Sequence, residues 1–240
     1  MRVHIKKKRD SVRAIRGEAM RRIMTLVLTV ALVPAAFAVS QTVMFDGDGW
    51  QVGEGSWSTS RGRLEQTQPR TGRAKANLPA TQSGDTEIRF DARYVGGAED
   101  GYAAFGIHVL MDSPNRGRAW GNGDSYLLWL TYDPAAYGGS GAYAQVYRSR
   151  SGSDMTRVSH IEIPRSYLAG VTLANVGNIT LPVRIRIDTA TGRVRVKDPV
   201  DPDLWWAFSL GTRNLSGRNI GLRTSSVAAS FDNVSITRIR

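Results

Sequence analysis

The sequence of 240 residues contains no cysteine. Disulfide bonds, thiolate chemistry and lipid attachment through an N-terminal cysteine are therefore excluded. Long apolar runs are also scarce, and the run in residues 23–34 is shorter than the roughly 20 residues that span a bilayer. A domain of about 200 residues buries roughly 70% of the surface that its unfolded chain exposes, so a hydrophobic core can hold it folded without covalent links.

Residues 20–38 have the three parts of a secretory signal peptide. Arg21 and Arg22 precede the apolar run, and Ala36-Phe37-Ala38 follows it with the small-x-small pattern of a cleavage site. We expect cleavage near Val39, which leaves no membrane span; an uncleaved N-terminal anchor is the alternative. Residues 1–19 are an unusually long basic lead-in, which a start codon assigned too far upstream of Met20 would explain.

An exported protein without disulfides fits the bacterial envelope, so we expect a periplasmic or cell-surface location. The net charge of +11 does not indicate a nucleic-acid partner, because most of it lies in the first 38 residues. That segment holds nine Lys or Arg and two acidic residues, whereas the remainder holds 23 basic and 19 acidic residues. Nucleic-acid binding needs a concentrated basic face, which this near-balance does not favour.

Alternation of period two predicts strands in most of the remaining chain. Residues 86–94 place Ile88, Phe90 and Ala92 on one face and charged side chains on the other. Residues 183–188 and 193–197 repeat the pattern around a turn that ends at Gly192, which predicts a hairpin.

Other segments are apolar on both faces, as central strands are. Residues 102–110 and 126–132 are of this kind, residues 143–148 are expected to pair with 126–132, and the final strand is expected at 228–238. A helical turn is expected only near 165–169. Many short strands with Gly- and Pro-rich turns, and no composition break, predict one β-sandwich domain in residues 39–240.

The order of these landmarks resembles the concanavalin A-like lectin/glucanase sandwich, in its laminin-G-like and sugar-hydrolase-related branches. The resemblance rests on short motifs along the chain: FDGDGW at 45–50, GSW at 55–57, GDTEI at 84–88, AFGI at 104–107, DSYLL at 124–128, GLR at 221–223 and FDNV at 231–234. It implies an all-β, two-sheet antiparallel jelly-roll β-sandwich, a fold that carries lectins, glucanases and interaction modules alike.

Catalytic residues are not apparent. Glucanases of this fold carry paired carboxylates on one strand, and Glu87 with Asp91 is the nearest candidate. Arg89 and Arg93 share their face, so we interpret the four as a solvated charge ladder. His108 and His160 are isolated. The sequence leaves enzymatic activity open and favours a non-catalytic role.

A structural calcium site is a further hypothesis. In related sandwiches the first and last strands lie side by side, and Asp46, Asp48 and Asp232 would meet at that seam. Ca²⁺ takes six to eight oxygen ligands, which carboxylates and loop carbonyls supply. Alternatively, Asp46 and Asp232 are turn residues that bond nearby backbone N–H groups.

Aromatic residues are the strongest functional clue, because sugar rings bind flat aromatic faces beside a few polar groups. Trp120 and Tyr137 lie in Gly-rich loops, and Tyr143, Gln145 and Tyr147 share one face of a strand. With Tyr126 on the neighbouring strand, they are our candidate glycan platform; the alternative is that most are core or cross-strand aromatics. One of Trp205 and Trp206 should face outward.

These observations favour an exported, non-catalytic carbohydrate-binding module. The alternatives are a structural or protein-binding component of the cell envelope and, third, a glycoside hydrolase. The expected partner is a glycan or an envelope protein, and the oligomeric state stays open.

Overall fold

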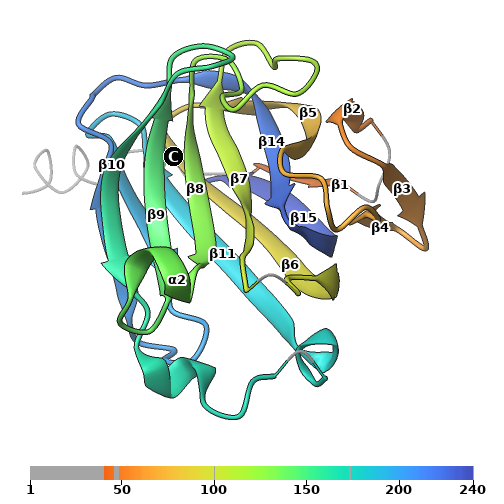
Figure 1. Ribbon diagram of the computed structural model, residues 1–240. Helices are drawn as coiled ribbons and strands as arrows, with labels where there is room; N and C mark the ends of the chain where they lie inside the picture. Colours follow the sequence, from red (N-terminus) through yellow and green to blue (C-terminus); the bar gives the residue numbers. More distant parts are fainter. Residues whose placement is uncertain (1–40, 46–48, 100, 173, 240) are drawn as a thin grey trace, which may run out of the picture. The chain divides into compact units, whose positions relative to one another are not determined.

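The alternating segments of the sequence are strands in the computed structural model, which describes residues 41–45, 49–99, 101–172 and 174–239. These residues belong to one compact unit, residues 39–240, built of strands joined mostly by short turns (Figure 1). The expected signal segment, residues 20–38, lies outside the described residues. Across the described ranges no helix has the length and apolar character to cross a membrane.

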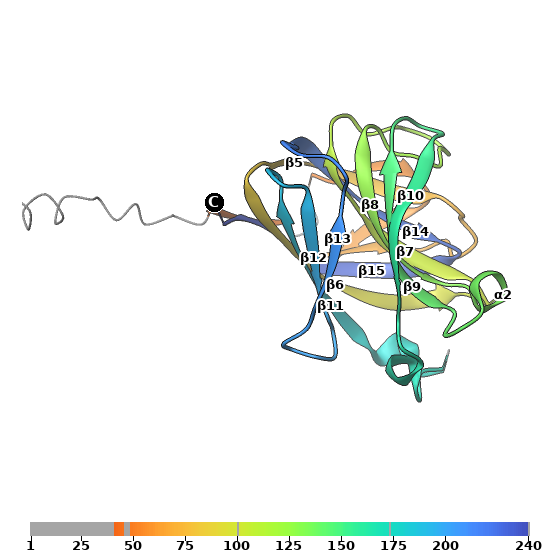
Figure 2. The ribbon, with the colours of Figure 1, turned by 90° about the vertical axis from the view of Figure 1, so that its left-hand side faces the viewer.

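The strands form two antiparallel sheets, which lie as the two layers of a sandwich (Figures 1 and 2). The seven-stranded sheet has the order β10 (Met155–Glu162), β9 (Ala142–Ser149), β8 (Ser125–Tyr132), β7 (Ala103–Met111), β14 (Gly217–Ser225), β5 (Ala74–Gln82), β2 (Gln51–Glu54). The eight-stranded sheet has the order β13 (Trp205–Ser209), β12 (Arg193–Lys197), β11 (Thr180–Asp188), β6 (Asp85–Gly97), β15 (Val227–Arg238), β4 (Arg63–Gln66), β3 (Trp57–Ser60), with β1 (Gln41–Phe45) also paired to β15. The predicted all-β, two-sheet antiparallel sandwich is confirmed.

The core lies between the two sheets. Ile88, Phe90 and Ala92 of β6 are buried, as the alternation predicted. Phe231 of β15 lies at the centre of an aromatic cluster, with ring centroids 6.0 Å from Phe90, 6.2 Å from Trp57 and 6.3 Å from Phe105. Because these rings come from both sheets, they tie the two layers together.

The individual strand predictions agree closely with the structure. Residues 183–188 and 193–197 form the β11–β12 hairpin, where the Gly192 N–H donates to the Asp188 carbonyl at 2.8 Å and Gly192 has a φ of +70°. Strands β8 and β9 pair as expected, and the first and last strands, β1 and β15, lie side by side.

Three short helices complete the described secondary structure. They are α2 (Pro134–Tyr137), η1 (Arg165–Leu168) and η2 (Val176–Asn178). The expected helical turn at 165–169 is the 3₁₀ turn η1. Asp133 begins α2 as its N-cap, and its carboxylate accepts from the Ala136 N–H at 2.9 Å.

Candidate functional site

One row of residues crosses the outer face of the seven-stranded sheet, with one residue from every strand. In strand order the row is His160, Gln145, Trp129, Gly106, Arg223, Lys75 and Glu54. Neighbours on each strand alternate inward, so Ile107, Leu128 and Leu222 belong to the core. The row therefore joins polar and aromatic side chains that are far apart in the sequence.

A loop of residues 115–124 covers the middle of this row. The Trp120 ring centroid lies 4.5 Å from the Arg223 guanidinium carbon and 6.4 Å from the Tyr147 ring, which it meets edge-on. Arg223 Nη1 donates to the Trp120 carbonyl, and Lys75 Nζ donates to the Gly121 carbonyl at 3.3 Å. Arg223 and Lys75 are consequently 0% exposed, although both lie on an outer sheet face.

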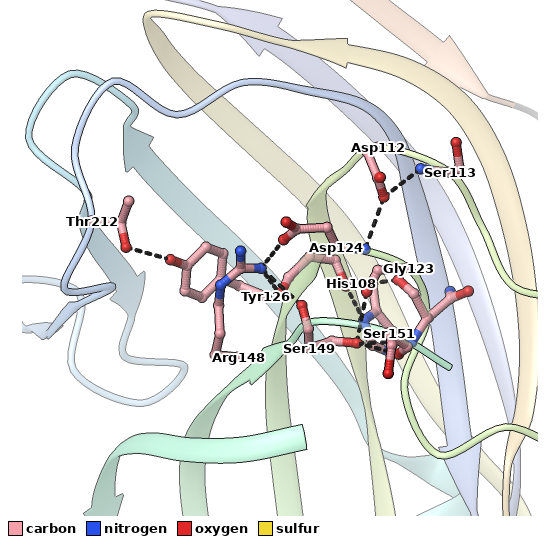
Figure 3. A network of polar contacts seen from close by, with 12 residues as sticks. His108, Asp112, Ser113, Gly123, Asp124, Tyr126, Arg148, Ser149, Ser151 and Thr212 are labelled. Carbon is pink, nitrogen blue, oxygen red and sulfur yellow. Dashed lines mark hydrogen bonds and ion pairs between the residues drawn. The ribbon is translucent and has the colours of Figure 1, made fainter. Parts of the chain in front are cut away.

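The loop backbone is held from the neighbouring strand as well (Figure 3). The Asn122 N–H donates to Ser149 Oγ at 3.0 Å, and Ser149 Oγ donates to the Gly123 carbonyl at 2.8 Å. Gly121 N–H donates to the Gly152 carbonyl at 2.7 Å, and Asn122 Nδ2 donates to Asn77 Oδ1 at 2.7 Å. These bonds fix the backbone of residues 121–123 and so place the loop that carries Trp120 on the sheet.

A hollow of about 550 Å³ opens beside Trp120. Its lining consists of Arg73, Arg118, Ala119, Trp120, Ser151, Gly152 and Ser153. The Arg73 guanidinium carbon lies 5.9 Å from the Trp120 ring centroid, and Arg73 Nη1 donates to the Arg118 carbonyl at 3.3 Å. The hollow thus combines one flat indole with several hydrogen-bond donors, which is the composition of a small polar-ligand site.

His108 lies buried beside the row and carries no charge. Its Nε2 faces Arg223 Nη1 at 3.3 Å, and its Nδ1 lies 2.9 Å from Ser125 Oγ, which donates to the Asn122 carbonyl at 2.8 Å. Because a guanidinium only donates, Nε2 must accept, so we assign the proton to Nδ1. Burial, and then the charges of Arg223 and Lys75, hold the pKa of His108 well below its usual value.

This arrangement predicts a loss of stability in mild acid. The unfolded chain binds a proton at His108 below about pH 6.5 and the folded chain does not, so the free energy of unfolding should fall by up to about 2 kcal/mol between pH 6.5 and 5. Urea denaturation of the wild type and of His108→Gln at both pH values measures it. An equal fall in both proteins would contradict the assignment to His108.

Three predicted platform residues share one face of β9, and of these Tyr147 contacts Trp120, whereas the Tyr143 ring lies 6.0 Å from the His160 ring. Tyr143, Gln145 and Tyr147 all lie on the outer face of β9, and the Tyr147 hydroxyl donates to Gln145 Oε1 at 3.2 Å. Tyr126 does not join them: it is 1% exposed and its hydroxyl bonds Thr212 Oγ1 at 3.0 Å on the core side of β8 (Figure 3). Tyr137 ends α2, and its side chain lies outside the described part.

Four further residues of the site were not predicted as site residues from the sequence. Trp129, Arg223, Lys75 and His108 lie at alternate positions of ordinary-looking strands, and only the pairing of those strands brings them together. The alternation of β8 did carry one usable signal, since it separates Trp129 from Tyr126 and places Trp129 with the β9 stripe.

The proposed calcium seam is only partly described. Asp46 and Asp48 lie outside the described residues, whereas Asp232 Oδ2 accepts from Arg63 Nη2 at 2.9 Å. Within the described ranges no three His, Asp or Glu side chains gather at a potential metal site. Asp232 Oδ1 also accepts from the Asn233 N–H at 2.8 Å, which is the backbone contact expected if Asp232 is a turn residue. The calcium site stays a prediction, because its other two carboxylates lie outside the described residues.

The carboxylate pair on β6 is also held by other side chains. Glu87 is 3% exposed rather than solvated; its Oε2 accepts from Arg186 Nε at 2.6 Å and forms an ion pair with Arg184 Nε at 2.9 Å. Burial would raise the pKa of Glu87, but hydrogen bonds from Arg186, Arg184 and Arg89 outweigh it and lower the pKa. A glycosidase acid needs a raised pKa, so Glu87 is poorly suited to donate a proton.

The sandwich is of the lectin-like jelly-roll class. No family model and no curated protein matches the chain. Carbohydrate-binding module CBM66 from Bacillus subtilis aligns with a TM-score of 0.50 and 14% identity over 78% of this chain and 93% of that one. The legume lectin-like domain from Entamoeba histolytica aligns with a TM-score of 0.55 and 8% identity over 79% of this chain and 89% of that one.

A third similar structure is the exoplasmic/lumenal domain of VIP36, solved with Ca²⁺ and Man3GlcNAc bound. It aligns with a TM-score of 0.53 and 12% identity over 80% of this chain and 84% of that one. At these identities the likeness establishes a shared fold. The predicted resemblance to concanavalin A-like sandwiches is thereby confirmed for the fold.

Proposed function

We propose that the protein is an exported, non-catalytic carbohydrate-binding module whose ligand lies against Trp120. The observation that carries the proposal is the half-buried Trp120 indole, which borders the hollow and meets Tyr147 edge-on. A pyranose ring can stack on such an indole while Arg73, Arg118 and the 151–153 turn bond its hydroxyls. Two fold neighbours with lectin-like or carbohydrate-binding names, and a third that was solved with Man3GlcNAc bound, support this proposal.

The test compares two surface tryptophans on a glycan array with purified residues 39–240. Trp120→Ala should lose about 2 kcal/mol of binding free energy, roughly thirtyfold in affinity, because stacking area is removed. Trp205→Ala, on the outer face of the other sheet, is the matched control and should bind as the wild type does. Equal affinity of Trp120→Ala and the wild type would refute the placement of the site.

The array also separates the remaining functions. Glycan binding that requires added Ca²⁺ would support a metal site formed by Asp46, Asp48 and Asp232. No glycan bound would favour the envelope-protein alternative, and crosslinking in intact envelopes would then identify the partner. Hydrolysis of a bound glycan that is abolished by Glu87→Gln would favour the glycoside hydrolase. Cell fractionation and N-terminal sequencing of the processed protein test export and cleavage near Val39.

A further inference from the structure

The candidate site carries an excess of positive charge. Arg73, Lys75, Arg118 and Arg223 all lie on or under the 115–124 loop or at its hollow. In the described part of the chain, none of the four lies within 4.0 Å of a carboxylate. Glu54, opposite Lys75 in the strand register, is the acidic neighbour that acts on it electrostatically, from a greater distance.

Both buried cations keep their charge at neutral pH. Burial, and then the charge of Arg223, lowers the pKa of Lys75 to about 8. Burial lowers the pKa of Arg223 to about 10. Two unpaired buried charges are expensive for a fold to hold, because each loses its hydration without gaining a counter-charge.

Arg223 has one edge of its guanidinium without a partner. Nη1 is occupied by the Trp120 carbonyl and by His108 Nε2, whereas the buried Nε and Nη2 have no hydrogen-bond partner. Nε and Nη2 form the edge that binds a carboxylate with two parallel N–H···O bonds. In the same row, Gln145 Nε2 is also buried without a partner.

From these observations we infer that the site selects a glycan that bears a carboxylate, as uronic and sialic acids do. The hydrogen bonds of the loop hold its backbone, and the one at Trp120 uses its carbonyl, so the indole can rotate about its side-chain bonds while the loop stays in place. That rotation would expose the Nε–Nη2 edge of Arg223 to the carboxylate, while the rotated indole still stacks on the sugar and Arg73 and Arg118 hold its outer part. This inference rests on the proposed carbohydrate binding and names its ligand class. If the two buried cations serve only to hold the loop in place through hydrogen bonds to its carbonyl groups, the protein should not distinguish acidic glycans from neutral ones.

The experiment uses carboxylate-bearing oligosaccharides, each paired with its own neutral form. Trigalacturonate and its methyl ester differ in charge and in one methyl group per carboxyl, and sialyllactose and its methyl ester form a second such pair. At least one acidic form should bind residues 39–240 about tenfold or more tightly than its ester, because a charge-assisted bidentate contact is lost on esterification. Isothermal titration calorimetry measures the affinities. The ratio of the affinity for the acid to that for its ester should fall as the NaCl concentration rises.

Two variants connect that preference to the site. Arg223→Lys keeps the charge and removes the fork, and Arg73→Gln removes an exposed cation and should fold normally. Each should reduce the acid-to-ester ratio severalfold, while Arg213→Gln, an exposed arginine outside the lining of the hollow, should leave it unchanged. Circular dichroism confirms that each variant is folded.

The outcomes distinguish this inference from the function on which it rests. Equal binding of acids and esters, weakened by Trp120→Ala, would overturn the acid selectivity and leave carbohydrate binding in place. Acid preference that survives in both Arg223→Lys and Arg73→Gln would also overturn it. Binding of neither form, together with a blank glycan array, would refute both proposals.

Discussion

Replacing Glu87 by glutamine should lower the free energy of unfolding at pH 7 by about 2–3 kcal/mol, below the larger values known for deeply buried pairs because its partners are half-exposed. Glu87 is the carboxylate among arginines on the outer face of the eight-stranded sheet, where Arg89 Nε also donates to it at 2.5 Å. Glutamine keeps the shape but removes the charge. The guanidiniums of Arg184 and Arg186 would then face each other without a counter-charge.

Trp205 makes this cluster sensitive to that change. Four cations lie near its ring centroid: Arg186 at 5.0 Å, Lys197 at 5.1 Å, Arg184 at 5.5 Å and Arg195 at 5.7 Å. An aromatic face attracts each cation but does not relieve the repulsion among them. Glu87 therefore neutralises a patch that would otherwise be strongly positive.

Urea denaturation at several pH values measures the effect. Because the pKa of folded Glu87 is lowered, its contribution is present above about pH 4.5 and is lost as the pH falls through the folded value, so wild type and variant should converge in acid. Glu65→Gln, on β4 of the same sheet, should change stability by less than about 0.5 kcal/mol. Equal losses in the two variants, or a difference independent of pH, would contradict this account.

The strands were predictable because their evidence is local. The alternation in β6 separates Ile88 and Phe90 from Glu87 and Arg89, and burial follows that division with one exception. The exception is Glu87, which the sequence places on a solvated face. Its burial depends on arginines of β11, about 100 residues further along the chain, and alternation within β6 carries no information about them.

The site was less predictable, for a similar reason. Lys75 and Arg223 occupy outward positions, where long charged side chains are normally solvated. They are buried because the 115–124 loop folds back over them, and a loop path cannot be read from periodicity. Trp120 could be found because a tryptophan in a polar, Gly-rich loop has no core to enter. Alternation in β8 separates Tyr126 from Trp129, but it does not tell which of the two faces the core, because β8 is apolar on both faces.

Gly106 provides the sharpest test of how the row is assembled. It lies between Trp129 and Arg223 in the strand register, and the absence of a side chain lets those two groups approach to 5.8 Å. A Cβ at this position would lie 2.9 Å from Trp129 Cε3 and would collide with the Leu128 carbonyl. Relief of that collision requires both the indole and the backbone of β8 to move.

Gly106→Ala should therefore lower the free energy of unfolding by about 3 kcal/mol, at the upper end of overpacking effects, because backbone stands in the way. Gly96→Ala is the matched control, since a Cβ on this other strand glycine meets no atom within 4 Å. Urea denaturation measures both, and near-ultraviolet circular dichroism should change only for Gly106→Ala, as Trp129 shifts. If the two substitutions lower the free energy of unfolding equally, the missing side chain at Gly106 does not position the row, and the contact between Trp129 and Arg223 does not depend on it.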